Sequence, residues 1–239
     1  MPTSVVVHQQ QTFGIRPRPT EPADNADADR LVFDPTPQQI VSACPGAVLE
    51  TVADNWPLIR DALVAAGFND PATFLAAIGN VYVETNVGDN TFKPIKELGG
   101  DAYFTELYEN NARTAAQLGN TQPGDGARYC GRGYIQITGR SNYRTYGRAL
   151  GIPLEDNPDL ALDAGVAARI LAAYFDGVGI PRRADTALAS ANQDWQPVRA
   201  AVNAGLLGYT AFFNVVQALR AAYDAQTASG GPRAGAAAG

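Results

Sequence analysis

Glu84 is the first residue in the sequence whose surroundings suggest acid–base chemistry. It ends the apolar run Ile78–Val83 and is followed at once by the polar, glycine-bearing loop TNVGDNT. A carboxylate held beside apolar side chains at the edge of a loop loses solvation, and this loss raises its pKa. A raised pKa suits a group that must deliver a proton near neutral pH. A solvated glutamate at a helix end shows the same local pattern, so a role for Glu84 needs support from elsewhere in the chain.

Hydrolysis by two carboxylates requires a partner for Glu84, and the following segment is rich in acidic residues. In glycoside hydrolysis the second carboxyl group lies close to the acid when it acts as a nucleophile, and about 6.5–9.5 Å away when it activates water. Spacing along the chain does not choose among the candidates, which are Asp89, Glu97, Asp101, Glu106 and Glu109.

The composition restricts this chemistry to carboxylates. The single histidine, His8, lies in a polar N-terminal stretch, which argues against a His-based triad or a His-ligated metal. Cys44 and Cys130 stand in no CxxC or Cys/His cluster, so we expect no metal site, and the two cysteines form either a disulfide or two buried thiols. The net charge of −6 argues against a nucleic-acid partner, because such partners are held by clustered Lys and Arg.

The chain is expected to fold as one domain between two flexible ends. At 239 residues, with 46% hydrophobic residues, it can bury a core without disulfides. Residues 1–35 are predicted to form a flexible leader, 36–228 the domain, and 229–239 a flexible tail. No stretch has the roughly 20 apolar residues of a membrane-spanning helix, and no secretion signal is recognised. We therefore expect no membrane insertion and synthesis in the cytoplasm.

Helix signals dominate the predicted domain, so the expected class is mainly α. Thr36, Asn55 and Asp70 are predicted helix N-caps, and the helix capped by Asp70 would run into the candidate acid. Later helical spacing occurs in NPDLALDAGVAARILAAYF and YTAFFNVVQALRAAY. The exception is GRGYIQITGRSNY, where β-branched residues between glycines predict a short strand.

The segment GNTQPGDGARYCGRGYIQITGRSNYRTYG interleaves tyrosines with arginines and amide side chains. Sugar-binding clefts use aromatic faces and amide hydrogen bonds to hold polyhydroxylated rings. A nucleic-acid groove has a similar local composition, but the acidic chain weighs against that interpretation.

This segment also carries a family resemblance. The run GRGYIQITGRSNY closely resembles the signature of family 19 glycoside hydrolases, and LGNTQPGDGARY is similar to phage and prophage endolysins of that family. VYVET resembles the helix end that carries the family's acid, FKPIKEL the loop after it, NPDLALD a later helix start, and VRAAVNAG the late Asn-Gly-Gly substrate loop. The resemblance covers about residues 50–225.

The resemblance implies a mainly α, two-lobed, lysozyme-like fold with a short β segment and a substrate cleft, and inverting hydrolysis without a cofactor. Carried over by position, it makes Glu84 the general acid. It also implies substrate contacts for Tyr134, Gln136, Thr138, Asn142, Tyr143 and Asn203. Ordinary strand roles for Gln136 and Thr138, and a helix-cap role for Asn203, remain alternatives.

For the second carboxylate, the resemblance favours Glu97. Endolysin relatives have an acidic residue after this loop, although the loop is longer here than is typical. Glu109 ranks second, because Tyr108-Glu109 resembles a Tyr-Glu pair found in many relatives. Glu106 remains a further candidate.

Two positions depart from the family pattern. Val83 precedes the acid where the family commonly has histidine, which removes a polar neighbour of Glu84. The late loop reads Asn203-Ala204-Gly205, with alanine where glycine is usual, so its backbone has less conformational freedom.

The predicted protein is a monomeric, peptidoglycan-degrading enzyme that acts on the cell wall after release or as part of a virion. Peptidoglycan is favoured over chitin because GNTQPGDG resembles the endolysin branch and no secretion signal is recognised. Two alternatives remain open: a chitinase that acts on chitin, and a wall-binding or structural phage component that kept the cleft and lost turnover.

Overall fold

The folded domain begins slightly earlier than predicted. The computed structural model describes residues 33–228. Phe33 is 1% exposed and packs edge-on against Tyr223, and Asp34 accepts a hydrogen bond from Trp56 Nε1. Phe33 and Asp34 therefore belong to the domain, although the sequence placed them in the leader. The rest of the predicted leader and the predicted tail, residues 1–32 and 229–239, lie outside the described residues.

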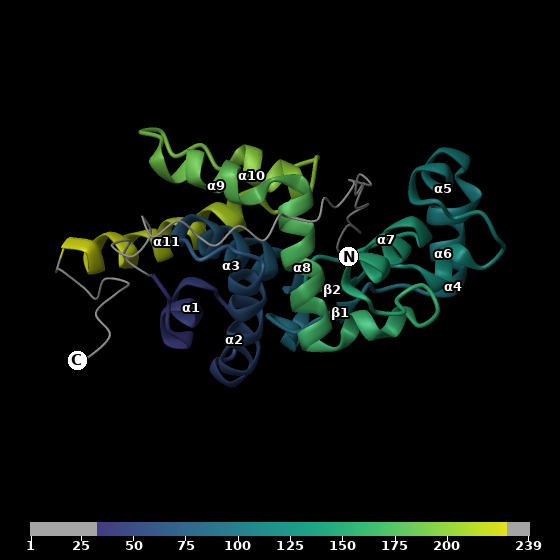
Figure 1. Cartoon of the computed structure of the whole chain (residues 1–239), viewed down its shortest axis with the longest axis horizontal. Helices are drawn as coiled ribbons and strands as arrows, with labels where there is room; N and C mark the ends of the chain where they lie inside the picture. Colours follow the sequence, from purple (N-terminus) through teal and green to yellow (C-terminus); the bar gives the residue numbers. More distant parts are fainter. Residues whose placement is uncertain (1–32, 229–239) are drawn as a thin grey trace.

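Helices dominate the described part of the chain, which confirms the predicted mainly α class, and they form two lobes (Figure 1). The larger lobe contains α1 (Pro37–Ala43), α2 (Leu49–Ala65), α3 (Pro71–Thr85), α8 (Ala164–Val178), α9 (Ile180–Ala189), α10 (Gln196–Val202) and α11 (Tyr209–Ala228). The smaller lobe contains α4 (Asp101–Thr105), the π-helical turn η3 (Glu106–Asn110), α5 (Ala112–Leu118) and α6 (Asp125–Arg128). Between the lobes lie α7 (Arg140–Leu150) and the strands β1 (Ile95–Lys96) and β2 (Arg132–Gly133). Short 3-10 turns are η2 (Gly88–Asn90) and η4 (Pro158–Leu162).

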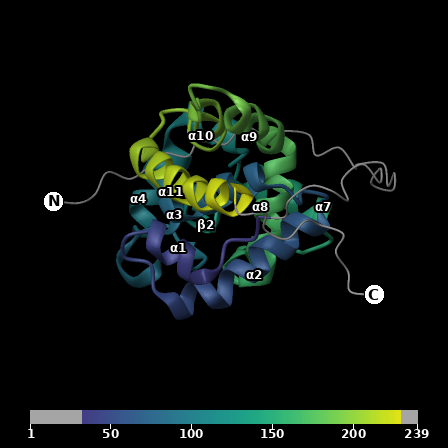
Figure 2. The same cartoon turned by 90° about the vertical axis from the view of Figure 1, so that its left-hand side faces the viewer.

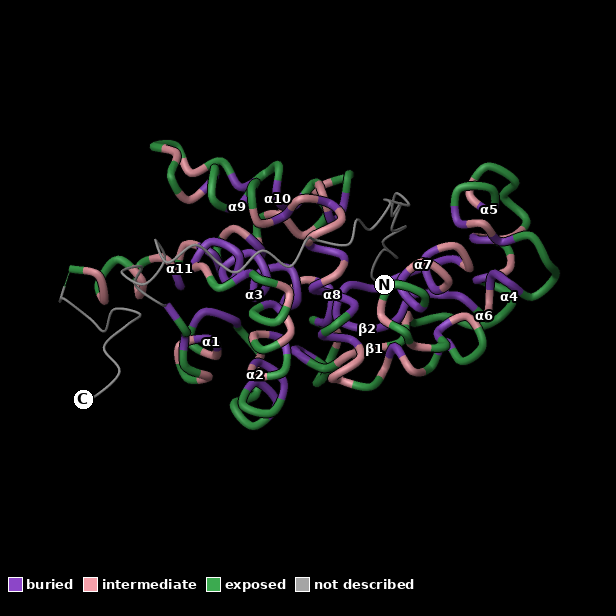
Figure 3. Tube along the Cα trace, in the orientation of Figure 1, coloured by how far each residue is buried: buried purple, intermediate pink, exposed green. Residues whose placement is uncertain are grey.

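Each lobe has its own buried cluster. The large cluster spans the helices of the larger lobe and the central segment, and Figure 3 shows this buried interior running along α3 and α8. The small cluster consists of Phe104, Tyr108, Leu118 and Cys130. Both cysteines are buried and unpaired, and burial raises the pKa of the Cys44 thiol to about 12. None of the helices within residues 33–228 is long and apolar enough to cross a membrane.

Helix α3 is the central element of the larger lobe. It starts as predicted, with Asp70 accepting a hydrogen bond from Thr73 N at 2.7 Å and Pro71 in the first turn. All but one of its residues are buried, because α9, α10 and α11 pack around it (Figure 2). Gly79 permits the closest approach: a Cβ there would lie 2.7 Å from Phe212 Cδ2 of α11. The helix therefore carries its last turn, with Glu84, into the protein interior.

The predicted N-cap at Asn55 is wrong. Helix α2 already begins at Leu49, and Pro57 lies inside it. The Asn55 side chain donates to Thr51 O one turn earlier and accepts a hydrogen bond from Tyr134 Oη. Burial of Trp56 on this helix outweighs the hydrogen bond that a proline removes, so tertiary packing overrides the local start signal.

The predicted central strand is shorter than expected. Only Arg132–Gly133 is extended, and it pairs antiparallel with Ile95–Lys96, a strand that the sequence did not reveal. The chain then reverses, because Gln136 adopts a left-handed φ of 52° and Ile137 bridges back to Arg132. This reversal brings the run GRGYIQITGRSNY, residues 131–143 and hereafter the central motif, against the loop that follows α3.

Candidate active site

Glu84 lies in the last turn of α3 with its side chain 3% exposed. The next residue fixes the loop beyond it: Thr85 Oγ1 donates to Val81 O at 2.7 Å and accepts a hydrogen bond from Phe92 N at 2.8 Å. Phe92 is fully buried and has a left-handed φ of 70°. The predicted loss of solvation at Glu84 is therefore confirmed.

The surroundings of Glu84 are not purely apolar, which corrects the environment inferred from the sequence. Arg199 Nη1, from α10, donates to Glu84 Oε1 at 2.6 Å and to Asn80 Oδ1 at 2.9 Å. Both partners of this ion pair are buried, with Arg199 only 1% exposed. Burial disfavours a charged carboxylate and a guanidinium favours it, so two opposing influences act on Glu84.

The same arginine attaches the late loop to the acid. Arg199 Nε and Nη2 donate to Leu207 O at 3.0 and 2.6 Å, and Asn203 Oδ1 accepts a hydrogen bond from Leu207 N at 3.2 Å. Asn203 is the C-cap residue of α10 and is 6% exposed. The structure thus joins Asn203 and Glu84, which are distant in sequence, through Arg199.

The two departures from the family pattern both lie at this loop. Val83 packs beneath Gly208, where a Cβ would lie 2.4 Å from Val83 Cγ1 and where φ is +74°. The backbone of Ala204 has no positive φ; Leu206, with φ 54°, makes the left-handed turn instead. The alanine therefore fits without strain, and the loop closes over an apolar side chain.

Glu97 follows β1 and is held at both carboxylate oxygens. Tyr108 Oη donates to Oε1 at 2.7 Å, and Gly131 N donates to Oε2 at 3.0 Å. Glu97 N in turn donates to Gly131 O at 2.8 Å. Burial and the nearby Glu97 raise the pKa of Tyr108, which keeps its phenol a donor. This carboxylate has a fixed orientation and remains partly exposed.

The central motif converges on Glu97 through Gly131. A Cβ at Gly131 would lie 2.9 Å from Gln136 Oε1 and 3.1 Å from Glu97 Oε2, so only glycine allows both side chains to approach. Gln136 Nε2 donates to Ile95 O and Gly133 O, across the two strands. The structure therefore brings Glu97 and Gln136 together at Gly131.

The remaining predicted contacts of the central motif are internal. Thr138 Oγ1 donates to Gln136 O, and Asn142 Nδ2 donates to Thr138 O, so these side chains brace the turn. Tyr134 and Tyr143 are fully buried, and their hydroxyls bond Asn55 Oδ1 and Cys130 O. The two tyrosines are core residues that support the motif, which corrects the expectation of an aromatic surface for sugars.

Glu109 and Glu106 have different surroundings from Glu97. The Glu109 carboxylate accepts hydrogen bonds from Gly124 N and Gly126 N and so ties η3 to the start of α6. Glu106 is exposed, and among residues 33–228 its carboxylate accepts a hydrogen bond only from Asn110 Nδ2. Both Glu97 and Glu109 thus accept a hydrogen bond at each oxygen, but only the carboxylate of Glu97 bonds to the central motif, at Gly131.

Sequence reasoning missed Arg199 and Tyr108 as members of the site. An arginine inside the apolar helical stretch PVRAAV was the available signal, since a buried guanidinium requires an acidic partner. Strained backbone is a second signal, because positive φ at non-glycine residues concentrates at functional sites. Three of the four such residues in the described chain, Phe92, Gln136 and Leu206, lie in the loops around Glu84 and in the central motif.

The two candidate carboxylates lie on separate elements: Glu84 is deeply buried beside a guanidinium, and Glu97 is held by a tyrosine and a backbone amide. Within residues 33–228, no cluster of His, Cys, Asp or Glu could hold a metal ion. This is an arrangement for acid–base chemistry by carboxylates.

Comparison with known proteins assigns the family. Residues 69–228 match the family model described as chitinase class I, which is family 19 of the glycoside hydrolases. This match spans more than half of the chain, so the chain belongs to that family. The predicted family and the predicted class of glycoside hydrolase are both confirmed.

The similar proteins are chitinases, and each curated match is partial. The chain is 36% identical over 116 residues to basic endochitinase B of Arabidopsis thaliana, a match that covers 48% of this chain and 34% of that protein. It is 49% identical over 47 residues to chitinase 8 of Oryza sativa subsp. japonica, a match that covers 20% of this chain and 18% of that protein. These matches span about a third or less of the curated relatives. Chitinase C from Streptomyces griseus HUT6037 aligns at a TM-score of 0.48 and 21% identity, covering 83% of this chain and 95% of that one.

Proposed function

We propose that this protein hydrolyses β-1,4 bonds between aminosugars, with Glu84 as the general acid. The observation that carries the proposal is the buried Glu84–Arg199 pair at the end of α3. Burial and the guanidinium act on the charged form of Glu84 in opposite directions, and the guanidinium stabilises the carboxylate that remains after the proton has left. An acid that must change charge state during catalysis benefits from both influences.

Glu97 is the proposed base. In this scheme Glu97 takes a proton from water, the water oxygen attacks the anomeric carbon, and Glu84 protonates the departing sugar oxygen. The hydrogen bonds from Tyr108 and Gly131 support this role, because they orient the carboxylate while leaving it partly exposed. Glu109 is the weaker candidate, since its carboxylate binds backbone amides at the start of α6, whereas that of Glu97 binds Gly131 in the central motif.

Gln136 and Asn203 are the proposed polymer contacts. Gln136 lies beside Glu97 at Gly131, and Asn203 belongs to the loop that Arg199 attaches to Glu84. Thr138 and Asn142 are proposed to act by holding the turn around Gln136.

Peptidoglycan is the first proposed substrate and chitin the second. The resemblance of LGNTQPGDGARY to endolysins supports peptidoglycan as the substrate. In this proposal the enzyme is made in the cytoplasm and reaches the wall on release. The relatives named endochitinase and chitinase support chitin. If the protein binds the wall polymer without cleaving it, it is instead a non-catalytic wall-binding or structural component.

Purified peptidoglycan and soluble chitin oligomers, incubated separately with the protein, test these assignments. New saccharide reducing ends from peptidoglycan alone support a lysin, and products from chitin alone support a chitinase. Glu84→Gln is the matched control, because glutamine keeps an acceptor for Arg199 but cannot donate an acidic proton. We expect turnover to fall by orders of magnitude in this variant while substrate affinity is retained. Near-normal turnover by Glu84→Gln would refute the assignment of the acid.

A further inference from the structure

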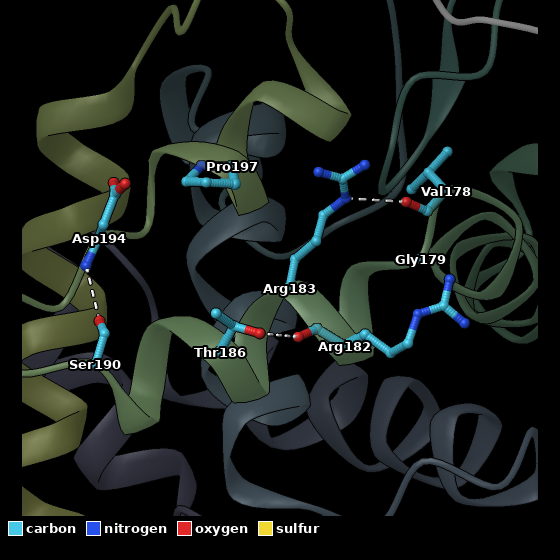
Figure 4. Close-up of a pocket in the computed structure, with 8 residues that line it drawn as sticks. All are labelled: Val178, Gly179, Arg182, Arg183, Thr186, Ser190, Asp194 and Pro197. Atoms are coloured by element: carbon cyan, nitrogen blue, oxygen red, sulfur yellow. Dashed lines mark hydrogen bonds between the residues drawn. The ribbon is translucent and has the colours of Figure 1, made fainter.

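A hollow between α9 and α10 gathers positive charge on an acidic protein. It is lined by Val178, Gly179, Arg182, Arg183, Thr186, Ser190, Asp194 and Pro197. Figure 4 shows Arg183 extending between Val178 and Pro197, and Arg182 extending beside Gly179. Both arginines are exposed, and the protein as a whole has a net charge of −6.

The charges of these two arginines are not neutralised within the described chain. Neither guanidinium forms an ion pair with a carboxylate of residues 33–228, and the side-chain hydrogen bond of Arg183 runs from Nε to the backbone oxygen of Val178. Asp194, the carboxylate of the hollow, accepts a hydrogen bond from Gln196 N. The guanidinium groups therefore retain donors for a ligand.

A second hollow contains arginines whose guanidinium groups are already bound to other groups of the protein. It is lined by residues of α6, α7 and the segment before η4, including Arg128 and Arg140. There Arg140 forms ion pairs with Asp125 and Glu155, and Arg128 donates to two backbone oxygens. In that hollow carboxylates pair with Arg140, whereas Arg182 and Arg183 form no ion pair with Asp194, the carboxylate that lines their hollow.

We propose that the hollow between α9 and α10 binds an oxyanion, a carboxylate or phosphate carried by the wall polymer. The planar donor fork of a guanidinium matches both groups, and a pair of such forks favours an anion over a neutral sugar. Gly179 and Arg182 line the hollow at the N-terminal end of α9, where the helix dipole favours negative charge. This inference rests on the proposed function, because it assigns the site to the same substrate.

The position of the hollow suits that role. Pro197 lines it from α10, and Arg199 of the same helix holds Glu84. α9 and α10 both contact α3, whose last turn carries the acid. The two helices that line the hollow therefore also pack against the helix that carries the acid. Chitin lacks such anions, so the site would favour an acidic wall polymer.

The test compares two charge-matched double variants in binding to insoluble peptidoglycan. Arg182→Gln/Arg183→Gln empties the hollow of cations, and Arg113→Gln/Arg148→Gln removes two exposed arginines elsewhere. Both are made in the Glu84→Gln background, so that the polymer is not digested during pelleting. We expect the hollow variant to bind roughly fivefold to tenfold more weakly, as for two partly exposed charge-assisted contacts, and the control to bind normally. Arg182→Lys/Arg183→Lys should recover part of the affinity.

Further arms separate the source of the anion and the failure of each proposal. Acid treatment that removes wall phosphate identifies the anion. If the hollow binds phosphate, the difference in binding between the wild type and the hollow variant should disappear on the treated wall. If it binds peptide carboxylates, the difference should remain. Binding to chitin should be equal in all variants. Equal losses in the hollow and control variants, or no peptidoglycan binding at all, would overturn the oxyanion site. Failure of the wild-type protein to cleave any aminosugar polymer would instead overturn the proposed function, and the binding comparison would still stand.

Discussion

Replacing Arg199 with methionine tests how the fold keeps a buried carboxylate in the interior. Arg199 and Glu84 are 1% and 3% exposed, so the variant leaves a buried acid without its cation. Removing one partner of a buried ion pair costs about 3–5 kcal/mol. Asn80 Oδ1 and Leu207 O also lose their donor, so we expect a loss near the upper end of that range. Most small proteins have only about 5–15 kcal/mol of stability in total, so this loss is large.

Urea unfolding followed by the fluorescence of Trp56 and Trp195 measures this loss, because both indoles are buried. The double variant Arg199→Met/Glu84→Gln should lose less than the sum of the two single variants, by about 2–3 kcal/mol. Lowering the pH should narrow the deficit of Arg199→Met, since protonation of Glu84 removes the unpaired charge. Additive losses, or a deficit below about 1 kcal/mol for Arg199→Met, would refute the reasoning.

Three further predictions follow from single contacts. Glu97→Gln should lower kcat by orders of magnitude, whereas Glu109→Gln should lower stability and leave kcat nearly unchanged; steady-state kinetics and thermal melting of both variants decide which acid is the base. Gly208→Ala should lower the free energy of unfolding by about 1–3 kcal/mol, because a Cβ at φ +74° would meet Val83. Denaturant titration measures this loss, and an unchanged free energy of unfolding would mean that the loop shifts to accept the methyl group. Hydrogen bonds from arginine lower the pKa of Glu155 from 4.5 to about 2. Its stabilising contribution is therefore full above pH 4.5 and is lost as the pH falls towards 2, so Glu155→Gln should melt below the wild type at pH 7 and with it near pH 2.

Local signals in the sequence predicted the starts of α1 and of α3, the helix that carries the acid. The caps at Thr36 and Asp70 act through their own neighbours in the chain, and both occur as predicted. The predicted N-cap at Asn55 was wrong because the role of this side chain depends on Tyr134, which lies far away in sequence. Propensity contains no information about such a partner.

The difference between local signals and contacts distant in sequence also explains which features of the site were predicted. The loss of solvation at Glu84 was predicted from its position between an apolar run and a polar loop, which is local information, and its role as the acid came from the family resemblance. The pairing with Arg199, and the hydrogen bonds that hold Glu97, depend on the packing of α10 and η3 and could not be read from spacing. Tyr134 was assigned to a sugar surface because composition does not distinguish an exposed ring from a buried one.

The central claim is that Glu84 donates the proton in hydrolysis of an aminosugar β-1,4 bond. Its most direct test is nuclear magnetic resonance of the anomeric protons during cleavage of the polymer or oligomer that the wild type cuts, with Glu84→Gln alongside. We predict that the α-anomer appears first with the wild type, as inversion requires, and that the variant forms almost no product. A first-formed β-anomer would contradict the water-activating role of Glu97, and equal product from the variant would contradict the role of Glu84.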